Sequence, residues 1–270
     1  MKILAVMGSP RGKGAGYRIV RKIEERMQAL GDVEFEYLFL KDADLKPCLG
    51  CYTCLAKGEE KCPLKDDRAA IVQRLLAVDG VILSSPIYVA NVSALMKNFI
   101  ERLAYNNHRP QFHRQKVLRV VNMAGDNPKT TLAFLKYALG GSRMIKGLGV
   151  ATPPWLQTER AVAGKERAIA RAAAEFHRAC LDTSLPSPTL QNLGMFLVMQ
   201  RLYLECPQVL PADYAYYRGK TYYYETKINP VKAALAKAIV GVMLYFMKDI
   251  GPGSVAWPVT QRREDTRHAA

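Results

Sequence analysis

The sequence has few histidines, and the four it has do not indicate a catalytic or metal site. His108, His113, His177 and His268 share no metal-ligand spacing. No Ser-His-Asp arrangement accompanies them either. Acid–base catalysis by side chains is therefore not indicated.

The chain also lacks a long apolar run at its start. Only a five-residue apolar stretch, Ile3–Met7, precedes Gly8, and it is too short for the core of a signal peptide. We therefore expect a cytoplasmic protein. The 270 residues are 49% hydrophobic and 23% charged, and the mean hydropathy is −0.09, as in soluble globular proteins. A chain of this length can bury a full core without disulfides.

Acidic residues are scarce in the middle of the chain. Between Glu101 and Glu159 the only acidic residue is Asp126, against nine Lys and Arg, so this stretch carries a charge of +8. One interpretation is a solvated basic face, and the other is steering of an anionic nucleotide or an acidic redox partner. No nucleic-acid-binding motif accompanies the charge, so nucleic acid is not an expected partner.

Apolar strand-like runs alternate with segments of helical periodicity over residues 1–180. The predicted strands are 2–7, 33–40, 81–85, 117–122 and 149–152. The predicted helices are 17–30, 66–77, 93–104, 130–139 and 161–180. This alternation predicts an α/β domain with a doubly wound, five-stranded parallel sheet covered on both faces.

The pattern stops at the Pro- and Ser-containing segment 181–188. Residues 189–250 are predicted to form a mainly helical, tyrosine-rich extension, and 251–270 a flexible tail. The extension could pack on the domain or on a dimer partner, or it could contact a membrane surface through Tyr and Lys. Its apolar runs are shorter than a membrane span.

A glycine-rich turn follows the first predicted strand. In a doubly wound sheet, ligands bind beyond the carboxyl ends of the strands, where this turn meets the first helix. Gly8, Ser9 and Arg11 lie there, and the free N–H groups of the helix start would bind an anion such as a phosphate. The alternative is a tight turn with no ligand, since any such turn favours glycine.

Two further loops should lie on the same rim. The third strand runs into Ser84-Ser85-Pro86-Ile87-Tyr88, where Tyr88 could lie against a planar ring system. The fourth strand ends in Asn122-Met123-Ala124-Gly125. The three loops predict one pocket.

Four of the six cysteines lie in the loop 47–63. Cys48, Cys51, Cys54 and Cys62, followed by Pro63, form the pattern C-x2-C-x2-C-x7-C-P. Disulfides are not expected in a cytosolic protein. The spacing is similar to that of a ferredoxin-type [4Fe–4S] motif, with a longer last gap. Structural zinc and unligated thiols are the alternatives.

These motifs together resemble those of a known family. Three segments resemble the NADPH-dependent FMN reductase group of flavodoxin-like proteins, namely GSPRGKGAG, residues 84–102 and the NMAG loop. The cysteine segment resembles the group's iron–sulfur flavoprotein branch. The resemblance implies that Ser9, Arg11 and the amides of Gly14, Ala15 and Gly16 hold the FMN phosphate. It also implies isoalloxazine contacts from Pro86, Ile87, Tyr88, Asn122, Met123, Ala124 and Gly125.

One position departs from the group's pattern. The group usually has Gly-Asn-Thr or Gly-Asn-Ser where this chain has Gly14-Ala15-Gly16, so a phosphate-binding hydroxyl is missing. Either FMN binds more weakly, or backbone amides and Arg11 carry the phosphate.

The sequence therefore predicts an FMN-containing oxidoreductase. FMN would take a hydride from NAD(P)H, or electrons from a reduced carrier such as a ferredoxin, and pass them through the cluster to a small-molecule or protein acceptor. The alternatives are a non-enzymatic electron carrier, a simple flavin or quinone reductase without a cluster, and a scaffold that has lost its cofactor. The resemblance also implies a homodimer or higher assembly.

Overall fold

The computed structural model describes residues 1–205 and 207–246 and divides the chain into two compact units, Met1–Pro186 and Ser187–Ala270. The predicted tail at 251–270, and residues 247–250 of the predicted extension, lie outside the described residues.

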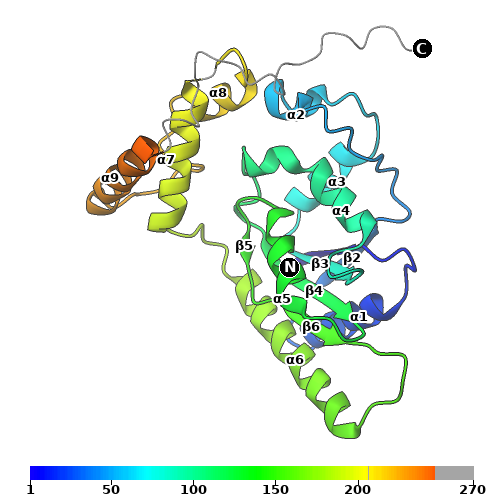
Figure 1. Cartoon of the computed structure of the whole chain (residues 1–270). Helices are drawn as coiled ribbons and strands as arrows, with labels where there is room; N and C mark the ends of the chain where they lie inside the picture. The colour runs from blue at the N-terminus through cyan, green and yellow to red at the C-terminus, as the bar shows by residue number, and fades with distance from the viewer. Residues whose placement is uncertain (206, 247–270) are drawn as a thin grey trace, which may run out of the picture. The chain divides into compact units, whose positions relative to one another are not determined.

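The first unit is built on a parallel sheet (Figure 1). Its strands are β1 (Lys2–Met7), β2 (Glu34–Phe39), β3 (Gly80–Pro86), β4 (Lys116–Met123), β5 (Arg143–Met144) and β6 (Leu148–Ala151). The order is β2-β1-β3-β4-β5, with β6 also paired to β4. Every strand pair is parallel, which confirms the predicted flavodoxin-like α/β class.

The edge of the sheet differs from the prediction of a single fifth strand. β5 pairs with the first two residues of β4, whereas β6 pairs with Val120–Met123 near its end. A strand of two residues has no apolar run that periodicity could detect. The predicted strand at 149–152 corresponds to β6, and β5 is an addition.

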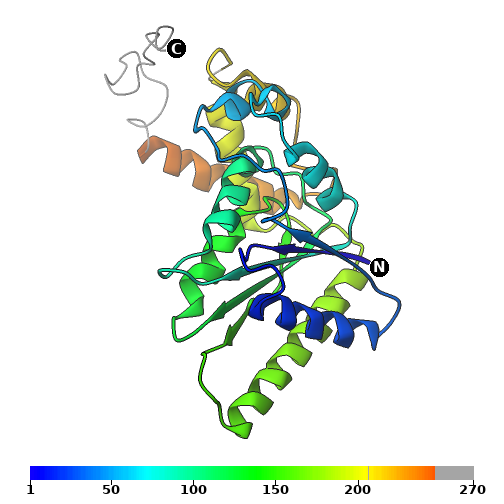
Figure 2. The same ribbon diagram turned by 90° about the vertical axis from the view of Figure 1, so that its right-hand side faces the viewer.

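Helices cover both faces of the sheet. All seven residues of β3 are buried, as expected for a central strand with helices on both sides. On one face lie α1 (Ala15–Gln28) and α6 (Glu159–Leu181), which contact each other (Figure 2). On the other lie α3 (Arg68–Leu76), α4 (Ala94–Arg102) and α5 (Pro128–Phe134). A short helix, α2 (Thr53–Ala56), lies within the cysteine loop.

The second unit consists of helices around an aromatic core. Up to residue 246, where the description ends, its helices are α7 (Leu190–Leu204), α8 (Pro211–Tyr217) and α9 (Pro230–Phe246). Phe196 and Tyr217 are fully buried, with ring centroids 5.5 Å apart, and Tyr203 lies 5.4 Å from Tyr217. The tyrosine-rich stretch therefore contributes to a core within this unit. Among the described helices, none combines the length and apolarity needed to cross a bilayer.

Candidate functional site

The structure brings the three predicted loops to one rim of the sheet. Met7, at the end of β1, is in register with Ser84 of β3, and Pro86 of β3 is in register with Asn122 of β4. Backbone hydrogen bonds continue this alignment beyond the strands, from Gly8 N to Ser84 O (2.8 Å) and from Ile87 N to Asn122 O (2.9 Å). The carboxyl ends of β1, β3 and β4 therefore form one continuous edge.

The first loop leaves the start of α1 open. Gly14 is the N-cap and makes no side-chain capping hydrogen bond, and the first turn holds no acidic residue. Ser9 is buried, and its hydroxyl accepts a hydrogen bond from Arg11 N (3.2 Å), whereas the Arg11 side chain is exposed. Uncapped N–H groups at the positive end of a 14-residue helix suit a phosphate.

Gly16, where the chain departs from the family's phosphate motif, lies in a crowded position. A Cβ atom at this position would lie 3.0 Å from Asn122 Oδ1 and 3.2 Å from Ser84 Oγ. A Ser or Thr side chain at residue 16 would therefore require these polar side chains of β3 and β4 to shift by a few tenths of an ångström. The sequence reveals the missing hydroxyl at residue 16 but not these two neighbours, which come from distant strands.

The second loop is a strained hairpin. Tyr88 and Asn91 exchange backbone hydrogen bonds of 2.8 and 3.1 Å, and the two residues between them have positive φ, +49° at Val89 and +61° at Ala90. Positive φ at both central residues is typical of a type I′ turn, which usually contains Asn-Gly. A β-branched residue in this region is strained. The hairpin holds Tyr88 43% exposed and Val89 fully exposed at the rim.

The other residues assigned to the flavin ring divide into two groups. Ile87 and Met123 are buried in the core beneath α4, so their side chains do not line the rim. Ala124 and Gly125 are exposed, and Asn122 is half-buried, with its Nδ2 donating to Thr152 Oγ1 at 3.4 Å. The loop after β4 therefore offers backbone groups and one amide side chain to a ligand.

The four loop cysteines line one small cavity at the other end of α4. Cys62 is buried, Cys54 is half-buried, and Cys48 and Cys51 are exposed. Asn98 of α4 holds the loop, because its Oδ1 accepts from Cys48 N (3.1 Å) and its Nδ2 donates to Leu45 O (2.9 Å).

Arg102, the last residue of α4, donates to a cysteine sulfur. Its Nη1 lies 3.2 Å from Cys62 Sγ, and its Nη2 lies 2.8 and 2.7 Å from the two carboxylate oxygens of Asp66. The Arg102 side chain is 3% exposed, and the Asp66 side chain is 1% exposed. Burial alone would lower the pKa of Arg102, but hydrogen bonds to Cys62 and Asp66 outweigh it and the pKa is raised. The guanidinium therefore stays charged beside the sulfur.

Two more arginines support the cysteine loop. Arg109 donates to Cys54 O (2.5 Å) and to Glu59 Oε2 (3.0 Å), and Arg68 donates to Glu59 O (2.6 Å). Burial and the nearby charges of the other three cysteines raise the pKa of Cys54, whereas hydrogen bonds with Thr53 lower that of Cys51. The cavity thus combines four thiols with positive charge.

The four thiols of the cysteine cavity are suitable ligands for a metal cluster, but the space between them is too small to hold one in this structure. Over residues 1–205 and 207–246, no group of three or more His, Cys, Asp or Glu side chains converges closely enough to hold a single metal ion. The cavity between the thiols measures about 20 Å³, which is room for about one water molecule. Four thiols are the donor set of a [4Fe–4S] cluster, and the loop would have to open around it.

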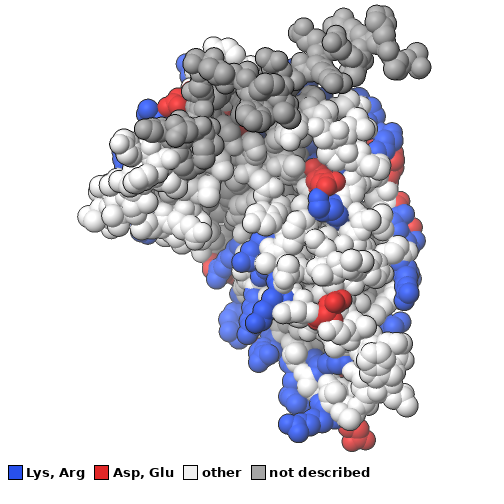
Figure 3. Space-filling model, viewed as in Figure 1, with Lys and Arg blue, Asp and Glu red and all other residues white. Residues whose placement is uncertain are grey.

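The basic stretch between Glu101 and Glu159 does not form a single solvated face. Four of its nine cations, Arg102, Arg109, Lys116 and Arg119, are buried. Arg119, for example, donates to the carbonyl oxygens of Leu132 and Ile145, and burial lowers its pKa. On the face drawn in Figure 3, exposed Lys and Arg side chains gather where Figure 1 places α6.

Gly16→Ser, which restores the family's usual hydroxyl, is expected to weaken FMN binding in a fluorescence-quenching titration. The new side chain requires the Asn122 or Ser84 side chain to shift by a few tenths of an ångström, and overpacking of this kind lowers the free energy of unfolding by about 1–3 kcal/mol. Gly14→Ala is the control, because φ is −80° there and its Cβ would meet only Arg11 Cβ, at 3.5 Å. Tighter FMN binding by Gly16→Ser would contradict this account of the motif.

Comparisons with known proteins agree with this geometry. A family profile described as NADPH-dependent FMN reductase matches residues 1–145. An iron-sulfur flavoprotein of Methanocaldococcus jannaschii is 39% identical over 104 residues, which cover 38% of this chain and 51% of that protein. An iron-sulfur flavoprotein of Archaeoglobus fulgidus is 32% identical over 151 residues, covering 56% of this chain and 64% of that protein. The chain thus spans about half to two thirds of the length of these relatives.

Solved structures share the fold at low sequence identity. A structure of RosB with bound 8-demethyl-8-formylriboflavin-5′-phosphate has a TM-score of 0.54 at 11% identity, covering 100% of this chain and 95% of that one. A flavone reductase has a TM-score of 0.52 at 15% identity, covering 69% and 66%. Because the family profile spans more than half of the sequence and the fold agrees with it, the chain belongs to the NADPH-dependent FMN reductase family.

Proposed function

We propose that the protein is an FMN-dependent oxidoreductase that takes electrons from NAD(P)H and carries a [4Fe–4S] cluster as a second redox centre. The observation that carries the proposal is the shared rim at the ends of β1, β3 and β4, with an uncapped helix start at one side and the exposed Tyr88 hairpin at the other. Bound FMN would supply hydride and electron chemistry, and the cluster would supply one-electron transfer.

The chain's own residues would bind and orient the flavin. The amides of Gly14, Ala15 and Gly16 and the Ser9 hydroxyl would hold the phosphate, and the exposed guanidinium of Arg11 would add a charged donor. Tyr88 and the loop from Asn122 to Gly125 would contact the ring. The strain at Val89 and Ala90 supports this assignment, since strained backbone often accompanies ligand binding.

The cysteine cavity supports the second centre. Cys48, Cys51, Cys54 and Cys62 would be the four ligands, and the relatives described above are named iron-sulfur flavoproteins. The positive charge of Arg102 and Arg68 would compensate the negative charge of a thiolate-ligated cluster. A protein redox partner such as a ferredoxin, and a homodimer, belong to the same proposal.

A flavin or quinone reductase without a cluster is the second candidate. It is favoured by the closed cysteine cavity, which has room for about one water molecule. In that case the thiols would serve only to fold the loop.

Anaerobically purified full-length protein tests both candidates. The proposal predicts steady NADPH oxidation that requires FMN, and about four irons per chain with a broad visible absorbance. Replacing Cys54 and Cys62 by Ala should remove the iron but leave FMN bound, whereas Cys180→Ala should retain both, because Cys180 lies in the core between the sheet and α6. Iron-free protein that oxidises NADPH would favour the simple reductase. If a ferredoxin fully reduces the protein but the protein does not oxidise NADPH, it is an electron carrier and not an enzyme.

Arg102 gives a second prediction. Arg102→Gln leaves the buried Asp66 carboxylate without its charged partner, with only the backbone N–H groups of Lys46 and Arg68 donating to it, which lowers the free energy of unfolding by about 3–5 kcal/mol. The double variant Arg102→Gln/Asp66→Asn should recover most of that loss in chemical denaturation. If both variants unfold like the wild type, the ion pair does not stabilise the loop.

The same variants test the effect of Arg102 on the cluster. A reduced cluster carries more negative charge, so the Arg102 donor on Cys62 favours reduction. The single variant Arg102→Gln, which removes the positive charge and keeps Asp66, should therefore show a lower cluster reduction potential in a spectroscopic titration, and the double variant, whose net charge is unchanged, should show a smaller shift. An unchanged potential would exclude a role for Arg102 in tuning the cluster.

A further inference from the structure

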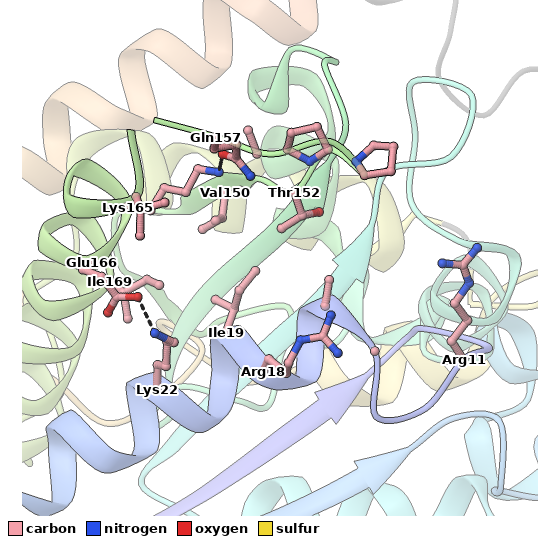
Figure 4. A pocket seen from close by; sticks show the side chains of 16 residues that line it. Arg11, Arg18, Ile19, Lys22, Val150, Thr152, Gln157, Lys165, Glu166 and Ile169 are labelled. Carbon is pink, nitrogen blue, oxygen red and sulfur yellow. Dashed lines mark hydrogen bonds and ion pairs between the residues drawn. The ribbon is translucent and has the colours of Figure 1, made fainter. Parts of the chain in front are cut away.

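A second cavity lies between α1 and α6, away from the residues expected to contact the flavin ring. It measures about 730 Å³, is open on one side, and is bounded by α1, the end of β6, the following loop 152–158 and the start of α6 (Figure 4). Of the residues assigned above to the flavin, only Arg11, Gly14 and Ala15 line it, all from the phosphate loop. Its size falls in the range of small-molecule sites.

The floor of this cavity is apolar. Ile19, Val150 and Ile169 line it and are 5%, 5% and 3% exposed, so they belong to the core between the sheet and its two covering helices. Pro153 and Val162 add further apolar surface. A floor of this kind favours a flat apolar ring.

The rim of the cavity is cationic. Arg11, Arg18, Lys22 and Lys165 line it together with a single acidic residue, Glu166. Glu166 forms an ion pair with Lys22, as the dashed line in Figure 4 marks. The other described residues that line the opening therefore leave three positive charges uncompensated.

Among residues 1–205 and 207–246, those three cations have no anionic partner. Lys165 donates to the neutral amide oxygen of Gln157, and within the described part of the chain the guanidiniums of Arg11 and Arg18 form no hydrogen bond or ion pair. Arg18 lies one turn along α1 from Gly14, on the side that faces α6 (Figure 4). Guanidinium groups match the geometry of phosphate oxygens.

We infer that this cavity is a second small-molecule site, which takes an organic phosphate ester of about mononucleotide size. Its ring would lie on Ile19, Val150 and Ile169, and its phosphate would lie between Arg18 and Lys165. A phosphate-ester site at this place does not depend on the flavin chemistry, and only its assignment to the electron donor rests on the proposed function. The ligand could be a separate nucleotide or the adenosine-phosphate end of the electron donor, and both share this chemistry.

The test is calorimetric titration of the full-length, FMN-loaded protein with 5′-AMP and with adenosine. We expect AMP to bind at least about tenfold more tightly than adenosine, and without displacing FMN. The variant Arg18→Glu/Lys165→Glu should weaken AMP binding about tenfold or more while FMN affinity is unchanged. Arg26→Glu/Arg167→Glu is the matched control, because these exposed residues lie on the same helices but do not line the cavity.

Three outcomes would overturn the inference. They are equal affinity for AMP and adenosine, wild-type AMP binding by Arg18→Glu/Lys165→Glu, and displacement of FMN by AMP, which would place the AMP phosphate in the flavin site. If AMP binds as expected, its inhibition of NADPH oxidation identifies the source. Competition with NADPH indicates the donor's adenosine phosphate, and no inhibition indicates a separate nucleotide. Loss of FMN binding with AMP binding intact would refute the proposed function alone.

Discussion

The close contact between Gly8 and the start of α4 is the constraint on which the candidate site depends. Gly8 N donates to Ser84 O at 2.8 Å, the Ser93 hydroxyl donates to Gly8 O, and Ser93 also caps α4 by accepting from Met96 N. A Cβ atom on Gly8 would lie 2.9 Å from Met96 Cβ, so only glycine fits. This contact ties the phosphate loop to the hairpin loop and fixes the direction of α4.

Helix α4 in turn links the two proposed redox centres. It begins at the flavin rim and ends at Arg102, which donates to Cys62, and Asn98 holds the cysteine loop on the way. Nine residues of α-helix span about 14 Å along the axis. One short helix therefore fixes the separation between the rim and the cysteine cavity, so a change in its packing would affect both.

The sequence predicts the strands and the rim well, because buried parallel strands are long apolar runs and their carboxyl ends must meet at one edge. The sequence does not predict features that depend on contacts between residues far apart in the chain. The turn at Val89 and Ala90 has no Asn-Gly signal, and β5 is too short to show a period. Arg102 and Arg119 suggest surface charge from composition alone, yet they are buried because carbonyls, Asp66 and Cys62 accept their hydrogen bonds. The meaning of Gly16 depends on Ser84 and Asn122, which no local pattern connects to it.

The most direct test of the central claim is a crystal structure of the FMN-loaded protein. The account predicts the phosphate within hydrogen-bonding distance of Ser9 and of the amides of Gly14, Ala15 and Gly16, with the ring between Tyr88 and the loop after β4. A flavin ring seated in the cavity between α1 and α6, on Ile19 and Ile169, would contradict it.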